Sequence, residues 1–301
     1  MAAAEEKMAR VPTTFLVMSD THGFQFDAST ADCPLRLPIQ KVDVLLHCGD
    51  LTQVGGISEF RKAIHMLSKI DAELKLVIAG NHDLEMDPTF DSDEPEDHAQ
   101  AVELWTGPEA KKAGITYLSE GTHEFDLSNG SQFTIYASPY QPEFGDWAFG
   151  HKHNEDRFNS AANVAPGATS IATSPVPSIE TVDVMMTHGP PRGILGIDEN
   201  GTHLGCPNLL HAVQRAKPLM HCFGHIHEGY GTELVAWSKM STSSLQQESG
   251  RVAQLNIAES SKALSMTPGE STLMVNAALQ TGPSQWRNAP WIVELSLPRK
   301  I

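Results

Sequence analysis

The sequence predicts an α/β fold, in which β-strands and helices alternate along the chain. Short runs of β-branched and apolar residues recur from residue 13 onwards, and segments with one apolar helical face lie between some of them. Asp, Asn or His follows five of the predicted strands directly, and four of these five strand ends also carry a glycine. In α/β sheets, ligands bind at the carboxyl ends of the strands. The sequence therefore predicts a functional site along one edge of a sheet.

The first part of the chain shows this alternation clearly. The apolar residues from Ile57 to Ile70 recur every three or four positions, so residues 57–69 are predicted to form an amphipathic helix. A second helix is predicted at 96–105, and Pro108 would end or restart it. The strands predicted in this part are 13–18, 42–47 and 74–79.

The second part contains fewer helices and more loops. A helix is predicted at 208–217, and loops are predicted at 150–178 and 238–250, which are rich in small and polar residues. The polar motifs run from Asp20 to His227 without a linker, so we expect residues 1–301 to form one domain. The strands predicted in this part are 134–137, 182–187, 219–223 and 291–297.

Composition and charge argue against several classes of protein. The 301 residues include 37 acids and 21 bases, which gives a net charge of −16, and no cluster of Lys and Arg is longer than two. Such a chain repels polyanions, so long nucleic acid is not the expected partner. The longest apolar runs have five or six residues, whereas a membrane span needs about 20. Residues 1–10 lack the apolar stretch of a secretory signal, so we expect a cytoplasmic protein.

Two further features have simple interpretations. Residues 85–97 contain seven acids and no base, and we interpret them as a solvated, mobile loop because they lack the spacing of an EF-hand. The cysteines form no CxxC pair, so we expect reduced and mostly buried thiols rather than a disulfide framework. They are Cys33, Cys48, Cys206 and Cys222.

The residues after the strands have the chemistry of a metal site. They offer carboxylate and amide oxygens and imidazole nitrogens but no thiolate, a set that suits Mn, Fe or Zn. Two neighbouring divalent ions need a bridging carboxylate, and Asp50 stands alone after its strand. The motifs are Asp20-Thr21-His22, Gly49-Asp50, Gly80-Asn81-His82-Asp83, His188-Gly189 and Gly224-His225-Ile226-His227.

In this order, the five motifs resemble those of the calcineurin-like metallophosphoesterase superfamily, over residues 20–227. Finer stretches resemble its MPPED-type subgroup of metallophosphoesterase-domain-containing proteins. The resemblance implies a four-layer α/β/β/α sandwich with two mixed β-sheets. The stretches that resemble the subgroup include 135–142 (IYASPYQP), 187–191 (THGPP), 224–231 (GHIHEGYG) and 276–278 (NAA).

The resemblance also implies roles for individual residues. Two divalent or mixed-valence metal ions would share Asp50, and His82 would be the catalytic imidazole, with Asp83 beside it as the orienting carboxylate. One metal would be held by Asp20, His22, Asp50 and His227. The other would be held by Asp50, Asn81, His188 and His225.

The implied activity is hydrolysis of a small phosphodiester, with cyclic nucleotides among the candidate substrates, and with His82 protonating the leaving group. One alternative is a phosphomonoesterase or protein phosphatase with the same metals, for which Arg192 would meet the extra negative charge. Another is a non-catalytic scaffold, against which the complete ligand set and His82 argue.

Other histidines and aromatic residues outside the motifs receive structural interpretations. His47 and His221 lie inside strands beside the ligand loops and are expected to be hydrogen-bonded core residues. His151 and His153 are expected at the surface. The aromatic cluster at 140–149 either belongs to the core or forms the wall of a pocket that stacks a nucleobase.

Overall fold

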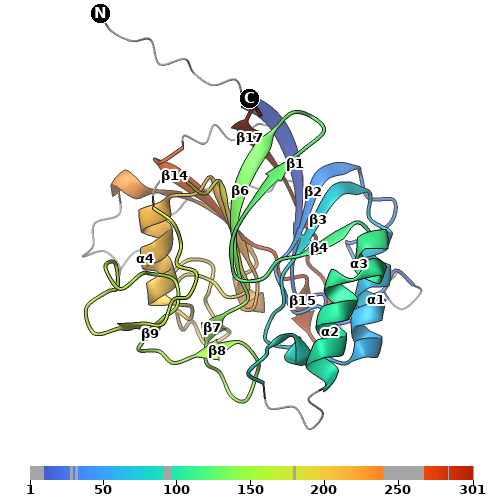
Figure 1. Ribbon diagram of the computed structural model, residues 1–301, viewed down its shortest axis with the longest axis horizontal. Helices are drawn as coiled ribbons and strands as arrows, with labels where there is room; N and C mark the ends of the chain where they lie inside the picture. The colour runs from blue at the N-terminus through green and yellow to red at the C-terminus, as the bar shows by residue number, and fades with distance from the viewer. Residues whose placement is uncertain are drawn as a thin grey trace, which may run out of the picture.

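The computed structural model describes residues 10–27, 30, 33–90, 96–178, 181–239, 268–283 and 285–300. Two mixed β-sheets lie face to face at its centre, and helices lie beside them (Figure 1). The predicted α/β class is therefore confirmed. Within the described ranges, no helix combines the length and the apolar character that crossing a membrane requires.

The first sheet has five strands, in the order β17-β1-β2-β3-β4. Strands β1 to β4 run parallel, and the edge strand β17 runs antiparallel to β1. The register places Met18 beside His47 and His47 beside Val77, so β1, β2 and β3 end at the same edge. The strands are β17 (Trp291–Pro298), β1 (Arg10–Met18), β2 (Val42–His47), β3 (Ala72–Val77) and β4 (Ile115–Tyr117).

The second sheet has six strands, in the order β13-β14-β12-β11-β6-β5. The four central strands are parallel, whereas β13 and β5 are antiparallel edge strands. The strands are β13 (Gly231–Ala236), β14 (Ser271–Asn276), β12 (Met220–Phe223), β11 (Val184–Thr187), β6 (Gln132–Ser138) and β5 (Gly121–Asp126).

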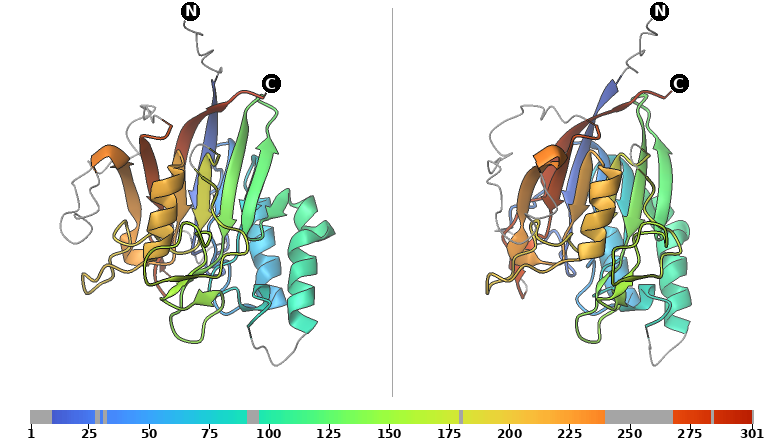
Figure 2. Two further views of the ribbon diagram at one scale, coloured as in Figure 1. Left: turned by 60° about the vertical axis from the view of Figure 1, so that its left-hand side comes forward. Right: turned by 90° about the vertical axis from the view of Figure 1, so that its left-hand side faces the viewer.

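Alternation along the strands forms the core between the sheets. In β1, Phe15 and Val17 contact residues of the second sheet, such as Ile135 and Met186, within one cluster of buried side chains. The intervening Leu16 belongs to a different cluster, which the helices share. Successive side chains of a strand point to opposite faces, so β1, β2 and β3 each contribute to both clusters. Figure 2 turns the molecule so that the outer face of the second sheet comes toward the viewer.

The helices cover the outer faces of the sheets. Phe60 and Trp105 are fully buried against the first sheet, with their rings edge to face. Leu209 and Val213 pack α4 against the second sheet. The α-helices are α1 (Ile57–Ser68), α2 (Glu96–Thr106), α3 (Pro108–Lys112) and α4 (Pro207–Ala216), and the 3₁₀ helices are η2 (Leu84–Met86), η3 (His227–Gly229) and η4 (Trp237–Lys239).

Short strand pairs occupy some of the connecting segments. The segment predicted as a loop at 150–178 is mostly irregular but includes three two-residue strands, and residues 240–250 of the other predicted loop lie outside the described residues. The short strands are β7 (Gln141–Pro142), β8 (Gly150–His151), β9 (Glu155–Asp156), β10 (Thr169–Ser170), β15 (Gln280–Gly282) and β16 (Gln285–Trp286).

Two expectations about polar residues are wrong, at three positions. The interpretation of the acidic segment as a solvated loop fails for Asp87. This residue is buried, and its carboxylate accepts the backbone N–H of Phe149 at 2.6 Å. It also fails for Glu85, whose carboxylate accepts the backbone N–H of Gly56 at 2.9 Å. His151 is buried rather than at the surface, because its ring packs edge to face on Phe158. Residues 91–95 of the acidic segment lie outside the described residues.

Candidate metal centre

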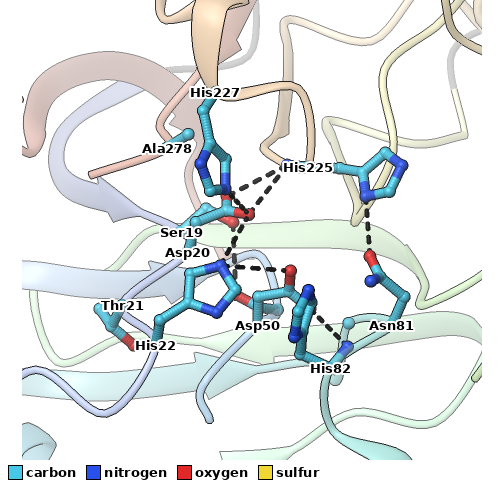
Figure 3. Close-up of polar contacts among 12 residues, drawn as sticks. Ser19, Asp20, Thr21, His22, Asp50, Asn81, His82, His225, His227 and Ala278 are labelled. Atoms are coloured by element: carbon cyan, nitrogen blue, oxygen red, sulfur yellow. Dashed lines mark hydrogen bonds and ion pairs between the residues drawn. The ribbon is translucent and has the colours of Figure 1, made fainter. Parts of the chain in front are cut away.

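The carboxyl ends of strands from both sheets meet at one place and bring the polar motifs together. The loops after β1, β2 and β3 carry Asp20, Asp50 and Asn81, and the ends of β11 and β12 in the second sheet carry His188 and the pair His225 and His227. Figure 3 shows side chains from these loops converging, with Asp50 between the group around Asp20 and the pair Asn81 and His225.

The first group is formed by Asp20, His22 and His227. The Nε2 atom of His227 lies 3.1 Å from Asp20 Oδ1, and the Nε2 atom of His22 lies 3.9 Å from the same oxygen. His22 Nε2 is also 3.5 Å from Asp50 Oδ2. Asp20 is fully buried, and its carboxylate accepts the backbone N–H of His225. Three donor atoms of this group lie within 4.8 Å of one another.

The second group is formed by Asp50, Asn81, His188 and His225. Asn81 Oδ1 lies 2.8 Å from His188 Nε2 and 2.7 Å from His225 Nδ1. His188 Nε2 is 3.4 Å from Asp50 Oδ1. Donor atoms of Asp50, His188 and His225 again fall within 4.8 Å of one another. The structure thus brings together all seven residues that the sequence predicts as metal ligands, in the two predicted groups, with Asp50 next to both.

The tautomers of two histidines fit a cation. His22 Nδ1 donates to the carbonyl oxygen of Thr52 at 3.0 Å, and His188 Nδ1 donates to that of Cys48 at 2.9 Å. A carbonyl can only accept, so Nδ1 carries a hydrogen in each ring, and Nε2 is the nitrogen left to ligate a cation. Histidines that ligate metals are usually held in this way. Among the described residues, the buried His22 Nε2 has no hydrogen-bond partner, and it faces two carboxylates, which is the environment that a bound cation would satisfy.

Glycines allow the carboxylates to approach the backbone closely. A Cβ atom on Gly224 would lie 2.0 Å from Asp20 Oδ2, and one on Gly80 would lie 2.3 Å from Asp50 Oδ1. Any larger residue would displace these carboxylates. The residues present therefore fit the metal centre that the donor chemistry predicts.

The backbone is strained at the same positions. Four of the seven non-glycine residues with positive φ in the described chain are predicted ligands, namely Asp20, His22, Asp50 and His225. Left-handed backbone is unfavourable for side chains with a Cβ and is concentrated at functional sites. The strain supports a functional role for this cluster.

Opposing effects set the charges of the centre. Burial would raise the pKa of Asp20, but the hydrogen bond and charge of His227 lower it to about 2. Burial would also raise the pKa of Asp50, but the charge of His188 holds the pKa of that carboxyl well below its usual range. For His188, burial would lower the pKa, but the charge of Asp50 raises it to about 9. Burial, followed by the charge of His188, lowers the pKa of His225 to about 4.

Two buried histidines contact residues next to the predicted ligands. The Nε2 atom of His47 lies 2.9 Å from the hydroxyl of Thr21, which stands between Asp20 and His22. His221 makes the same contact, at 2.9 Å, with Thr187 next to His188. Burial lowers the pKa of each of these histidines to about 3, so both rings are neutral. The prediction that His47 and His221 are hydrogen-bonded core residues is confirmed.

His82 and Asp83 have separate surroundings. His82 Nδ1 contacts the carbonyl oxygen of Gln53, and the backbone N–H of His82 donates to Asp50 Oδ1 at 2.9 Å. His82 also lies within reach of His22 and Asp50 as a possible third group of donors. Asp83 points elsewhere, so the expectation that it orients His82 is not met.

Asp83 instead joins the loops after β2 and β3. Its buried carboxylate accepts the backbone N–H groups of Leu51, Thr52 and Gly80 and the hydroxyl of Thr52, at 2.8–3.2 Å. Burial, together with the charge of Asp50, raises the pKa of Asp83 to about 7. Its partners are mostly backbone groups, and backbone donors leave no signature in a sequence.

The aromatic cluster divides into core and site residues. Phe149 is buried in the core, whereas Phe144 is 73% exposed. The ring of Trp147 is tilted over that of His82, with 4.0 Å between the ring centroids. The sequence suggested this region as a pocket wall, but it did not indicate which aromatic residue would contact which motif.

Comparison with known proteins identifies the family. A model of calcineurin-like phosphoesterases matches residues 13–229. Metallophosphoesterase domain-containing protein 1 from Homo sapiens is 34% identical over 236 residues, which cover 73% of this chain and 62% of that protein. A UPF0046 protein from Caenorhabditis elegans is 34% identical over 235 residues, covering 75% of this chain and 54% of that protein. These two matches thus span less than two thirds of the relatives. Another UPF0046 protein from Caenorhabditis elegans is 30% identical, covering 72% of this chain and 69% of that protein. With these matches added to the geometry of its Asp and His cluster, the chain belongs to the calcineurin-like phosphoesterase family.

Proposed function

We propose that this chain hydrolyses small phosphodiesters, with cyclic nucleotides among the candidates, using two divalent cations such as Mn, Fe or Zn. The observation that carries the proposal is the position of Asp50 between two groups of donors. One group would hold a cation through Asp20, His22, Asp50 and His227, and the other through Asp50, Asn81, His188 and His225. Cations bound there would neutralise phosphate oxygens and lower the pKa of water.

His82 is the residue placed to deliver a proton. Its Nδ1 is engaged by the carbonyl of Gln53 and therefore carries a hydrogen, so Nε2 is the nitrogen left to exchange protons with a substrate. The side chain is partly exposed beside the buried Asp50. When hydroxide attacks phosphorus and the bond to the leaving oxygen breaks, protonated Nε2 gives its proton to that oxygen.

The charge of the centre supports a diester. Two divalent cations opposed by Asp20 and Asp50 leave two net positive charges, because the other ligands are neutral when they bind a cation. A phosphodiester carries one negative charge and the attacking hydroxide a second, so the charges balance. A phosphomonoester dianion adds a third negative charge, which would require a further cation. Arg192, exposed in the loop after His188, is the candidate for that role.

A hydrolysis screen tests the proposal. The purified chain is incubated with Mn²⁺ and, in turn, with cyclic nucleotides, an aryl phosphodiester and the matching aryl phosphomonoester. We expect the diesters to be hydrolysed faster than the monoester. A faster rate with the monoester, lost in Arg192→Ala, would instead identify a phosphomonoesterase. Lack of turnover with Mn²⁺, Fe²⁺ and Zn²⁺ would indicate a non-catalytic scaffold.

A further inference from the structure

We propose that Trp147 is the positioning residue of His82, and that its indole ring and the carbonyl of Gln53 together fix the imidazole. This inference rests on the proposed function, in which His82 delivers a proton. It assigns to an aromatic ring the task that the sequence suggested for Asp83, whose carboxylate is fully used by the loops after β2 and β3.

The contacts of His82 show why a second support is needed. The hydrogen bond from Nδ1 to Gln53 fixes one atom of the ring but leaves rotation about that contact. The Trp147 ring lies over the imidazole at a centroid distance of 4.0 Å and an interplanar angle of 33°. The edge-to-face contact with His22, at 4.7 Å, adds a second ring. Contacts in two directions define the plane of the imidazole and hence the direction of Nε2.

The loop that carries Trp147 is firmly attached to the motif that carries His82. The backbone N–H of Ala148 donates to the carbonyl of Asn81 at 3.3 Å, and the N–H of Phe149 donates to the buried carboxylate of Asp87 at 2.6 Å. Gln141 closes the loop by donating to the carbonyl of Ala148 at 2.8 Å. The residues directly after Trp147 therefore hold it next to the segment that carries His82.

Stacking of this kind has a measurable size. An aromatic pair contributes a favourable free energy beyond that of its buried area. If the contact is lost in the transition state, the rate falls by roughly three- to tenfold. The loss should depend on the leaving group, because a weakly basic leaving oxygen departs without a proton and a strongly basic one needs it.

The kinetic test compares Trp147→Leu and Trp147→Phe with the wild type on methyl 4-nitrophenyl phosphate and methyl phenyl phosphate. We expect Trp147→Leu to lower kcat roughly three- to tenfold on the phenyl ester, with a smaller effect on the nitrophenyl ester and little change in KM. Trp147→Phe should recover most of the rate. The control is Phe144→Leu, which removes an exposed aromatic residue from the same loop and should leave both rates unchanged.

A double-mutant cycle decides whether Trp147 acts through His82. In the His82→Ala background, Trp147→Leu should have no further effect, because the ring it positions is gone. Equal losses on both esters, or losses that multiply with those of His82→Ala, would overturn the proposal.

An NMR measurement gives a readout that does not depend on turnover. The Cε1–H signal of His82, identified by its disappearance in His82→Ala, should shift when Trp147→Leu removes the ring current, and Trp147→Phe should shift it less. An unchanged signal would refute the contact. If the wild type hydrolyses none of the substrates, the proposed function fails, and this measurement alone still decides whether Trp147 holds the imidazole.

Discussion

At the scale of single residues, the proposed proton delivery by His82 has the clearest consequence for rate. Of the third group of donors, only His82 lies outside the seven predicted ligands, so its removal leaves both predicted groups complete and should spare bound metal. We expect His82→Ala to lower kcat by roughly 10²–10⁴-fold, which corresponds to about 3–5 kcal/mol. Turnover and metal content are measured on the same preparation. Full turnover with full metal content would show that His82 is not the proton donor.

The buried neutral histidines make stability depend on pH. In the folded chain burial lowers the pKa of His221 to about 3, whereas in the unfolded chain it should be near 6.5. The unfolded state therefore binds more protons below pH 6.5, and this contribution to stability is lost as the pH falls from 6.5 towards 3. We expect the wild type to lose about 1.4 kcal/mol more per pH unit than His221→Gln in this window.

Urea unfolding at pH 6.0, 5.0 and 4.5 checks this difference. Glutamine can still contact the hydroxyl of Thr187, so the variant keeps the neighbouring ligand loop in place. Parallel slopes for the two proteins would show that His221 is not kept neutral by burial.

The roles of single residues could be predicted only where a motif carried them. The order of Asp, Asn and His after the strands indicated all seven residues that the structure gathers into the two groups. Spacing could not show that Asp83 binds backbone N–H groups or that Trp147 contacts His82, because both depend on how distant loops pack. The burial of His151 was missed for the same reason.

At the scale of elements, the ends of strands determine the geometry of the centre. Gly224 follows β12 and lies so close to Asp20 that a Cβ would meet its carboxylate and the Ser19 hydroxyl within 2.2 Å. We expect Gly224→Ala to displace Asp20, to reduce bound metal and to lower the free energy of unfolding by about 1–3 kcal/mol.

Gly282→Ala in β15 is the matched control, because among the described residues a Cβ there meets only Gln285, at 4.0 Å. Elemental analysis and urea unfolding are compared for the two variants. Undiminished bound metal in Gly224→Ala would show that the loop after β12 adapts without moving Asp20.

Strands with continuous apolar runs were predictable, and polar or very short ones were not. The bounds of β2 agree with the prediction at 42–47, because its buried apolar run is bounded by polar and glycine residues. In the edge strand β5, exposed polar side chains alternate with partly buried ones, and β4 has only three residues. Neither therefore shows the continuous apolar run of a buried strand. In β14 the apolar run is short, and its pairing with β12 and β13 forms the strand.

At the scale of the whole molecule, metal binding should stabilise the fold. A cation present at about 100 times its Kd adds about 2.7 kcal/mol, which for a chain of this size corresponds to a rise in Tm of about 4 °C. We expect Mn²⁺ to raise Tm by this amount and a chelator to reverse the change. Differential scanning calorimetry measures both.

Asp50→Asn is the informative variant for this experiment, since Asp50 lies next to both groups of donors. It should abolish most of the rise in Tm and reduce the content of bound metal. A full rise in the variant would show that the stabilising ions bind elsewhere.

Each of the two donor groups takes side chains from both sheets. His227 reaches Asp20 across the interface, and His188 and His225 reach Asn81 in the same way. Neither sheet alone therefore supplies all the ligands of an ion. The affinity for Mn²⁺ should then depend on how closely the two sheets pack against each other. A core substitution far from the centre that lets the two sheets shift relative to each other would lower the affinity for the ion before the chain unfolds.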